Sequence, residues 1–93
     1  MTVKRINKRV ARKLFDEGKE FWIVPRLQDP LHYGNLINFK GAANYYDGYT
    51  SFDALVNAFE YYNCDNERGT YSAFYIEVKE GWKALFSLMF GLS

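Results

Sequence analysis

The chain has 93 residues, almost half of them apolar and a quarter charged, which is the composition of a globular domain rather than of a disordered segment. Its formal net charge is +1 at pH 7, so it lacks the strong acidity expected of a protein that imitates DNA. One cysteine excludes an internal disulfide, and we expect no cleavable signal peptide because no apolar run follows the basic start. No segment approaches the roughly 20 apolar residues that a membrane-spanning helix needs. We therefore expect a single domain over residues 1–93, located in the cytoplasm.

The first two predicted elements are a short edge strand over 3–6 and a helix over 7–17. Asn7 is a suitable N-cap for this helix, and Gly18 can adopt the positive φ with which many helices end. Four apolar residues recur at helical spacing and share one face, which we expect to point into the core: Val10, Ala11, Leu14 and Phe15.

The opposite face of this helix is basic. Six cations precede the first acidic residue of the chain, and three of them, Arg9, Arg12 and Lys13, point outward together on a helix. This face could contact phosphate or an acidic partner. The alternative is that it is only the solvated side of an amphipathic helix, and no other segment continues the basic patch.

A strand is predicted over 20–27, where apolar residues occupy both faces and Pro25 marks an edge or the end of the strand. The region 28–49 has many Gly, Asn and Asp residues and reads as a long loop. Only 36–39 resembles a strand within it, paired with the first through a loose hairpin.

Aromatic residues make up 19% of the chain, and this loop is rich in tyrosine. Tyrosine combines a large contact area with a polar tip, so exposed tyrosines favour binding, whereas buried ones fill small cores. We predict that the tip of the loop, which also holds His32, binds a partner. The predicted contact residues are Tyr33, Tyr45, Tyr46, Asp47 and Tyr49.

The clearest pattern lies in 50–78, where a helix, a tight turn and a strand follow one another. Five residues predict the core-facing stripe of the helix: Phe52, Leu55, Val56, Phe59 and Tyr62. Thr50 or Ser51 can cap its start, and Asp53 lies in the first turn, where the helix dipole favours negative charge. Gly69 can supply the positive φ of the reversal, and 70–78 is dense in aromatic and β-branched residues typical of a strand.

The end of the chain, 82–92, keeps helical spacing but is more apolar than one stripe requires. It could close one face of the sheet. The alternative is a homo-oligomer or partner contact, for which the surplus residues Leu88, Phe90 and Leu92 are the candidates.

No combination of residues predicts catalysis, a metal site or a cofactor site. His32 is the only histidine, and no acid lies at a spacing that would place it in a catalytic arrangement. Cys64 follows a helix and precedes an acid, a setting that raises the pKa of a thiol, so we interpret it as a packing residue. We expect the protein not to be an enzyme.

Three motifs follow one another in the chain: KRVARKLFDEGK at 8–19, FWIVP at 21–25, and a helix that closes with Y-N-C before a strand. The residues of the third motif are Tyr62, Asn63, Cys64, Glu67, Gly69, Tyr71, Phe74 and Tyr75. Over most of residues 4–78 the chain resembles a group of small proteins from phages and mobile elements of Gram-positive, Clostridium-like bacteria. These proteins have no assigned activity, so no functional residue can be transferred. The resemblance implies accessory cargo of mobile DNA, whose small proteins often act against host defence.

Together these observations predict an α+β fold, with a small, mostly antiparallel sheet of three to four strands packed with two to three helices. The first functional hypothesis is a non-enzymatic protein of the bacterial host cytoplasm that binds and inhibits a defence component, as an anti-CRISPR protein does. The alternatives are a small oligomer that sequesters a nucleotide-like ligand and a nucleic-acid-binding protein that uses the basic helix.

Overall fold

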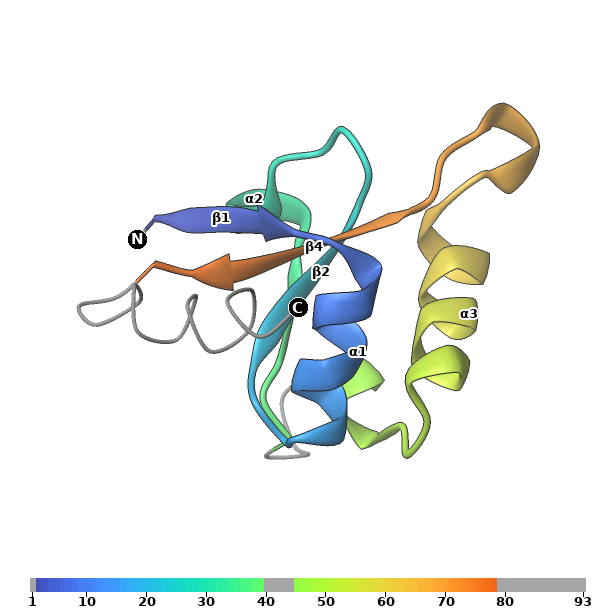
Figure 1. The fold of residues 1–93 in the computed structure, drawn as a ribbon. Coiled ribbons are helices and arrows are strands. Elements are labelled where there is room, and N and C mark those ends of the chain that lie inside the picture. The colour runs from blue at the N-terminus through green and yellow to red at the C-terminus, as the bar shows by residue number, and fades with distance from the viewer. Residues whose placement is uncertain (1, 40–44, 79–93) are drawn as a thin grey trace.

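A four-stranded antiparallel sheet forms the centre of the molecule, which we describe from a computed structural model covering residues 2–39 and 45–78 (Figure 1). The strands are β1 (Val3–Ile6), β2 (Phe21–Pro25), β3 (Asn35–Ile37) and β4 (Ser72–Glu77). Their order in the sheet is β1-β4-β2-β3, so β4 lies between strands that precede it in the chain. The α+β prediction is confirmed, as is the placement of β1 at an edge of the sheet.

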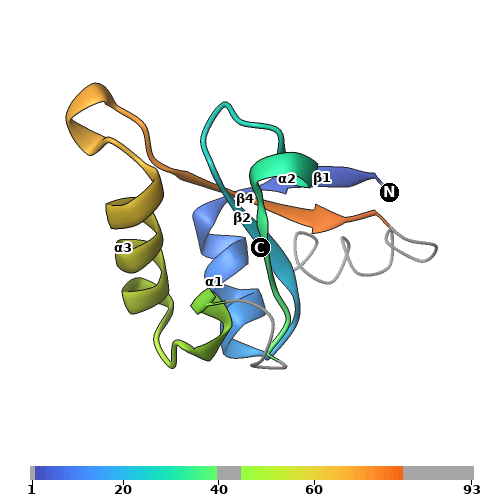
Figure 2. The same cartoon turned by 180° about the vertical axis from the view of Figure 1, so that it is seen from behind.

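Two helices, α1 (Lys8–Asp16) and α3 (Phe52–Asn63), lie on the same side of the sheet (Figure 1). The short helix α2 (Pro30–Tyr33) lies on the opposite side (Figure 2). Two 3-10 helices, η1 (Tyr45–Gly48) and η2 (Asn66–Arg68), precede and follow α3. The main core fills the space between the sheet and the two longer helices, and its largest fully buried side chains include Phe21, Phe59, Leu14, Ile23, Ile37 and Leu55.

The ends of α1 follow the predicted local chemistry. The Asn7 side chain accepts a hydrogen bond from the Val10 backbone N–H at 2.8 Å, which satisfies one of the free amides of the first turn. At the other end Gly18 has a φ of +69°, and the Lys19 amide donates to the Leu14 carbonyl at 2.9 Å. This is the hydrogen-bonding pattern with which a glycine-terminated helix reverses direction.

The α3 segment starts as predicted, but its apolar stripe is shorter. Ser51 Oγ accepts from the Ala54 amide at 3.4 Å, which identifies Ser51 as the N-cap. Phe52 and Phe59 are buried, whereas Tyr62 is 65% exposed and does not belong to the core. Tyr62 lies in the last turn of α3, and the spacing of apolar residues alone does not show where along a helix its buried face stops.

The turn between α3 and β4 contains Gly69 with a φ of +77°, as the sequence predicts. Beyond it, β4 pairs with β2 from Tyr75 opposite Trp22 to Ser72 opposite Pro25. Pro25 therefore ends a central strand rather than marking an edge strand. The pairing of β3 with β2 is also as predicted, over a shorter segment.

The segment 28–49 is not the single long loop that the sequence suggests. Its Asp29 side chain accepts from the Leu31 amide at 3.0 Å and caps α2, in which Pro30 occupies the start of the helix. A Cβ at Gly34 would lie 3.1 Å from the Trp22 ring, so α2 ends against the face of the sheet opposite α1. The loop prediction failed because four residues are too few to show helical periodicity.

The predicted helix over 82–92, with the oligomerisation candidates Leu88, Phe90 and Leu92, lies outside the described residues. Within the described part of the chain, no helix has both the length and the apolar character needed to cross a membrane.

Candidate functional site

Four tyrosine side chains gather where η1 meets the end of α3, and we call this group the tyrosine surface. Its members are Tyr45, Tyr46 and Tyr49, from η1 and the residue after it, and Tyr62 from the last turn of α3. The ring centroids of the first three lie between 5.1 and 6.4 Å apart. Such spacing is typical of aromatic rings in direct contact.

Tyr46 anchors this group to the core. Its ring meets the buried Phe59 edge-on at 5.2 Å, and its hydroxyl accepts a hydrogen bond from Asn63 Nδ2 at 2.9 Å. Tyr49 stacks on Tyr46 with an interplanar angle of 19° and is also packed against the core. Both rings are therefore held in fixed positions before any partner arrives, which lowers the entropic cost of binding.

Tyr45 and Tyr62 form the exposed part of the tyrosine surface, at 70% and 65% exposure. The pKa of Tyr49 is raised, first by a hydrogen bond with Tyr45, then by partial burial and by the nearby Tyr45, Tyr62 and Tyr46 hydroxyls. The raised pKa keeps the Tyr49 phenol protonated at neutral pH, so it can donate a hydrogen bond. An uncharged, polar-tipped aromatic surface of this kind is typical of the centre of protein–protein interfaces.

Asp47, which the sequence placed among the partner-binding residues, has a structural role instead. Its side chain is buried, and Oδ1 accepts from the backbone amides of Asn38 and Phe39. Phe39 has a φ of +61°, so the carboxylate stabilises an unfavourable turn after β3 and fixes η1 beside it. A buried side chain with these bonds is not available to a partner, and that part of the prediction is wrong.

Tyr33 does not join the other predicted tyrosines. It lies on α2, which is separated from η1 by the length of β3 (Figures 1 and 2). His32 is its neighbour there and meets its ring edge-on at 4.5 Å. The sequence treated 28–49 as one loop with a single tip, whereas β3 runs between the two groups and separates them.

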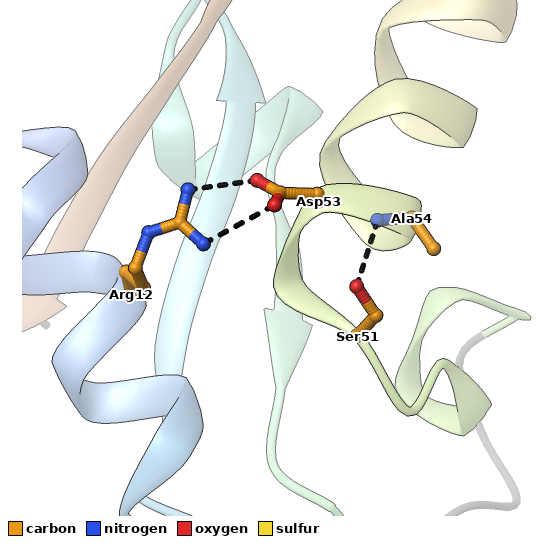
Figure 3. Close-up of polar contacts among 4 residues, drawn as sticks. All are labelled: Arg12, Ser51, Asp53 and Ala54. Atoms are coloured by element: carbon orange, nitrogen blue, oxygen red, sulfur yellow. Dashed lines mark hydrogen bonds and ion pairs between the residues drawn. The ribbon is translucent and has the colours of Figure 1, made fainter.

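The basic face of α1 is exposed at Arg9, Arg12 and Lys13, but Arg12 is held by α3. Its guanidinium binds both carboxylate oxygens of Asp53, with Nη2 at 2.7 Å from Oδ1 and Nη1 at 3.4 Å from Oδ2 (Figure 3). The guanidinium also lies over the Phe52 ring at 4.9 Å. Arg12 therefore links two helices, and the expectation that all three cations are merely solvated is wrong for this residue.

This ion pair predicts a pH-dependent contribution to stability. The hydrogen bonds and charge of Arg12 lower the pKa of Asp53 in the folded state. A carboxyl whose pKa is lower when folded stabilises the fold above its ordinary pKa, about 4, and this contribution is lost as the pH falls through the folded value. We expect Asp53→Asn to have a lower Tm than the parent at pH 7 and the same Tm near pH 2, measured by circular dichroism.

Arg12→Gln is the reciprocal test, because it removes the other member of the pair. Its Tm deficit should also become smaller at acidic pH and at high salt, since both side chains are partly exposed, and the part that remains at pH 2 reports the loss of the contact with the Phe52 ring. A deficit that persists unchanged at pH 2 in both variants would show that packing rather than charge joins the two helices.

Cys64, directly after α3, is partly buried against the core. Burial and then the charge of Glu60 raise the pKa of its thiol to about 11. The predicted direction is confirmed, but the cause differs from the neighbouring acid and helix end that the sequence suggested. A thiol of this pKa is almost wholly protonated at neutral pH and is a poor nucleophile.

Within residues 2–39 and 45–78, no three His, Cys, Asp or Glu side chains are grouped closely enough to hold a metal ion. In this part of the chain the tyrosine surface is the best-defined candidate site, and its polar-tipped aromatic rings are of the kind that contact a partner. Comparison with protein-family models, with curated proteins and with solved structures gave no match.

Proposed function

We propose that the protein is a non-enzymatic binding protein that blocks a component of bacterial defence through its tyrosine surface. The observation that supports the binding role is the pairing of two anchored rings, Tyr46 and Tyr49, with two exposed ones, Tyr45 and Tyr62. Tyrosine and tryptophan dominate the energetic centres of protein interfaces because they bury much area at little conformational cost.

The class of partner rests on the resemblance to small proteins of phages and mobile elements. At a net charge of +1 the chain does not offer the acidic surface of a DNA mimic, so inhibition through aromatic contact with a protein is the more plausible route. Nucleic-acid binding through α1 is a weaker alternative, because Asp53 already neutralises the charge of Arg12. Of the three predicted cations, Arg9 and Lys13 would then have to contact the phosphates.

The test is a phage plating assay in a Gram-positive host with an active CRISPR system directed against the phage. Expression of the parent protein should restore plaque formation. The double variant Tyr45→Ala, Tyr62→Ala should restore at least about tenfold fewer plaques than the parent. Both side chains are exposed, so the variant should keep its fold, which its Tm verifies.

Tyr33→Ala is the matched control, because it removes another exposed tyrosine, which lies on α2 and outside the tyrosine surface. It should restore plaques as well as the parent does. An equal loss in the control, or full activity of the double variant, would contradict the role of the tyrosine surface. If Arg9→Gln with Lys13→Gln alone abolishes the effect, the nucleic-acid alternative is favoured.

A further inference from the structure

A second candidate site lies where β1 leaves the sheet. β1 pairs with β4 only as far as Ile6 opposite Phe74, and the chain then turns into α1. β4 begins at Ser72, on the side of the molecule where α3 ends, so its first residues extend beyond the part that pairs with β1 (Figure 1). A cavity of about 500 Å³ occupies this notch. Its volume is in the range of roughly 300 to 1,000 Å³ that small-molecule sites occupy.

One wall of the notch is a fixed hydrogen-bond acceptor. Glu60, on α3, accepts from the Ser72 amide at 2.9 Å and from the Ser72 hydroxyl at 2.8 Å, and both bonds go to Oε2. The carboxylate thus takes the place of the strand that would otherwise pair with this edge of β4. Its other oxygen, Oε1, receives no donor from the described residues and remains able to accept a hydrogen bond.

The other wall is formed in part by two basic residues, Arg5 and Lys8, and neither forms an ion pair with a described residue. Arg5 lies over the Tyr75 ring at 6.0 Å, a contact that orients the guanidinium without neutralising it. Tyr71, which is 45% exposed, completes the lining with an aromatic ring. The notch therefore combines positive charge, a ring and a carboxylate acceptor within one cavity.

We propose that this notch binds a nucleoside monophosphate. The phosphate would lie against Arg5 and Lys8, the base would stack on Tyr71, and Glu60 Oε1 would accept from a base N–H group. The opposite charges of the two walls favour a ligand that has both an anionic group and hydrogen-bond donors over a simple anion. Guanosine monophosphate meets these requirements, because it has a phosphate, a ring and a base edge with N–H donors for Oε1.

The experiment is a titration of the full chain with guanosine monophosphate, followed by amide chemical shifts. We expect saturable shifts at Arg5, Lys8, Tyr71 and Ser72, with a Kd on the order of 100 μM. Guanosine and inorganic phosphate each supply half of the recognition and should bind at least about tenfold more weakly. No saturation up to about 10 mM, or equal binding of inorganic phosphate, would overturn the proposal.

Variants locate the site. Arg5→Gln with Lys8→Gln should weaken binding of guanosine monophosphate at least about tenfold, whereas Lys13→Gln, an exposed cation of the same helix outside the notch, should leave it unchanged. Equal weakening by Lys13→Gln would mean non-specific attraction and would overturn the proposal. Glu60→Gln should reduce the preference for the nucleotide over inorganic phosphate, and if this variant fails to fold, the cation variants still decide the question.

Discussion

Replacing Phe59 by alanine is expected to lower the free energy of unfolding by about 3 to 5 kcal/mol. The ring is fully buried at the centre of the core between α3 and the sheet, and it also supports Tyr46 of the tyrosine surface at 5.2 Å. Alanine would leave a cavity that the surrounding helix and strands can fill only in part. Urea denaturation at 25 °C, followed by circular dichroism, measures the loss.

Tyr62→Ala is the matched control on the same helix. The sequence pattern places Tyr62 in the same stripe as Phe59, but its 65% exposure predicts a loss below about 1 kcal/mol. Similar losses in the two variants would mean that the described burial of α3 is wrong. The Phe59 variant should also be less active in the plating assay if the proposed role of the tyrosine surface holds, because Tyr46 loses its support.

Asp47→Ala should have the next largest effect, a loss of about 2 to 4 kcal/mol. The substitution leaves the Asn38 and Phe39 amides without their acceptor in a partly buried turn that already contains a positive φ. Asp47→Asn keeps an oxygen that can accept these bonds, so it should be clearly less destabilising than alanine. Urea denaturation of both variants checks this order.

The outcome that would contradict the structural role is an alanine variant as stable as the parent. In that case Asp47 would be free for a partner, as the sequence suggested, and its loss would instead appear in the plating assay. A decrease in both stability and plating would show that η1 must be fixed for the tyrosine surface to act.

The elements with strong local signals were predicted well from the sequence. Asn7 and Gly18 mark the ends of α1, Ser51 marks the start of α3, and Gly69 marks the turn into β4, because each acts through hydrogen bonds or dihedral angles within a few residues. Periodicity likewise identified the buried faces of both helices. It failed at Tyr62, where the helix extends beyond the sheet that it covers.

The features that depend on distant parts of the chain could not be predicted in this way. Arg12 and Asp53 are 41 positions apart, and their contact follows only from the packing of α1 beside α3. The separation of Tyr33 from Tyr45 requires the position of β3, and the burial of Asp47 requires the turn that follows it. The notch depends on the strand order, which hydrophobic patterns leave undetermined.

The central position of β4 has a consequence for how the protein is made. The β2–β3 hairpin and β1 do not touch in the sheet, and β4 joins them through pairs as distant in sequence as Val3 and Glu77. During synthesis the two pieces therefore leave the ribosome unjoined, and the sheet closes only after residues 72–77 have emerged. A chain that stalls before this point exposes the apolar faces of both pieces, which makes it a target for chaperones and proteases rather than a shorter working version of the protein.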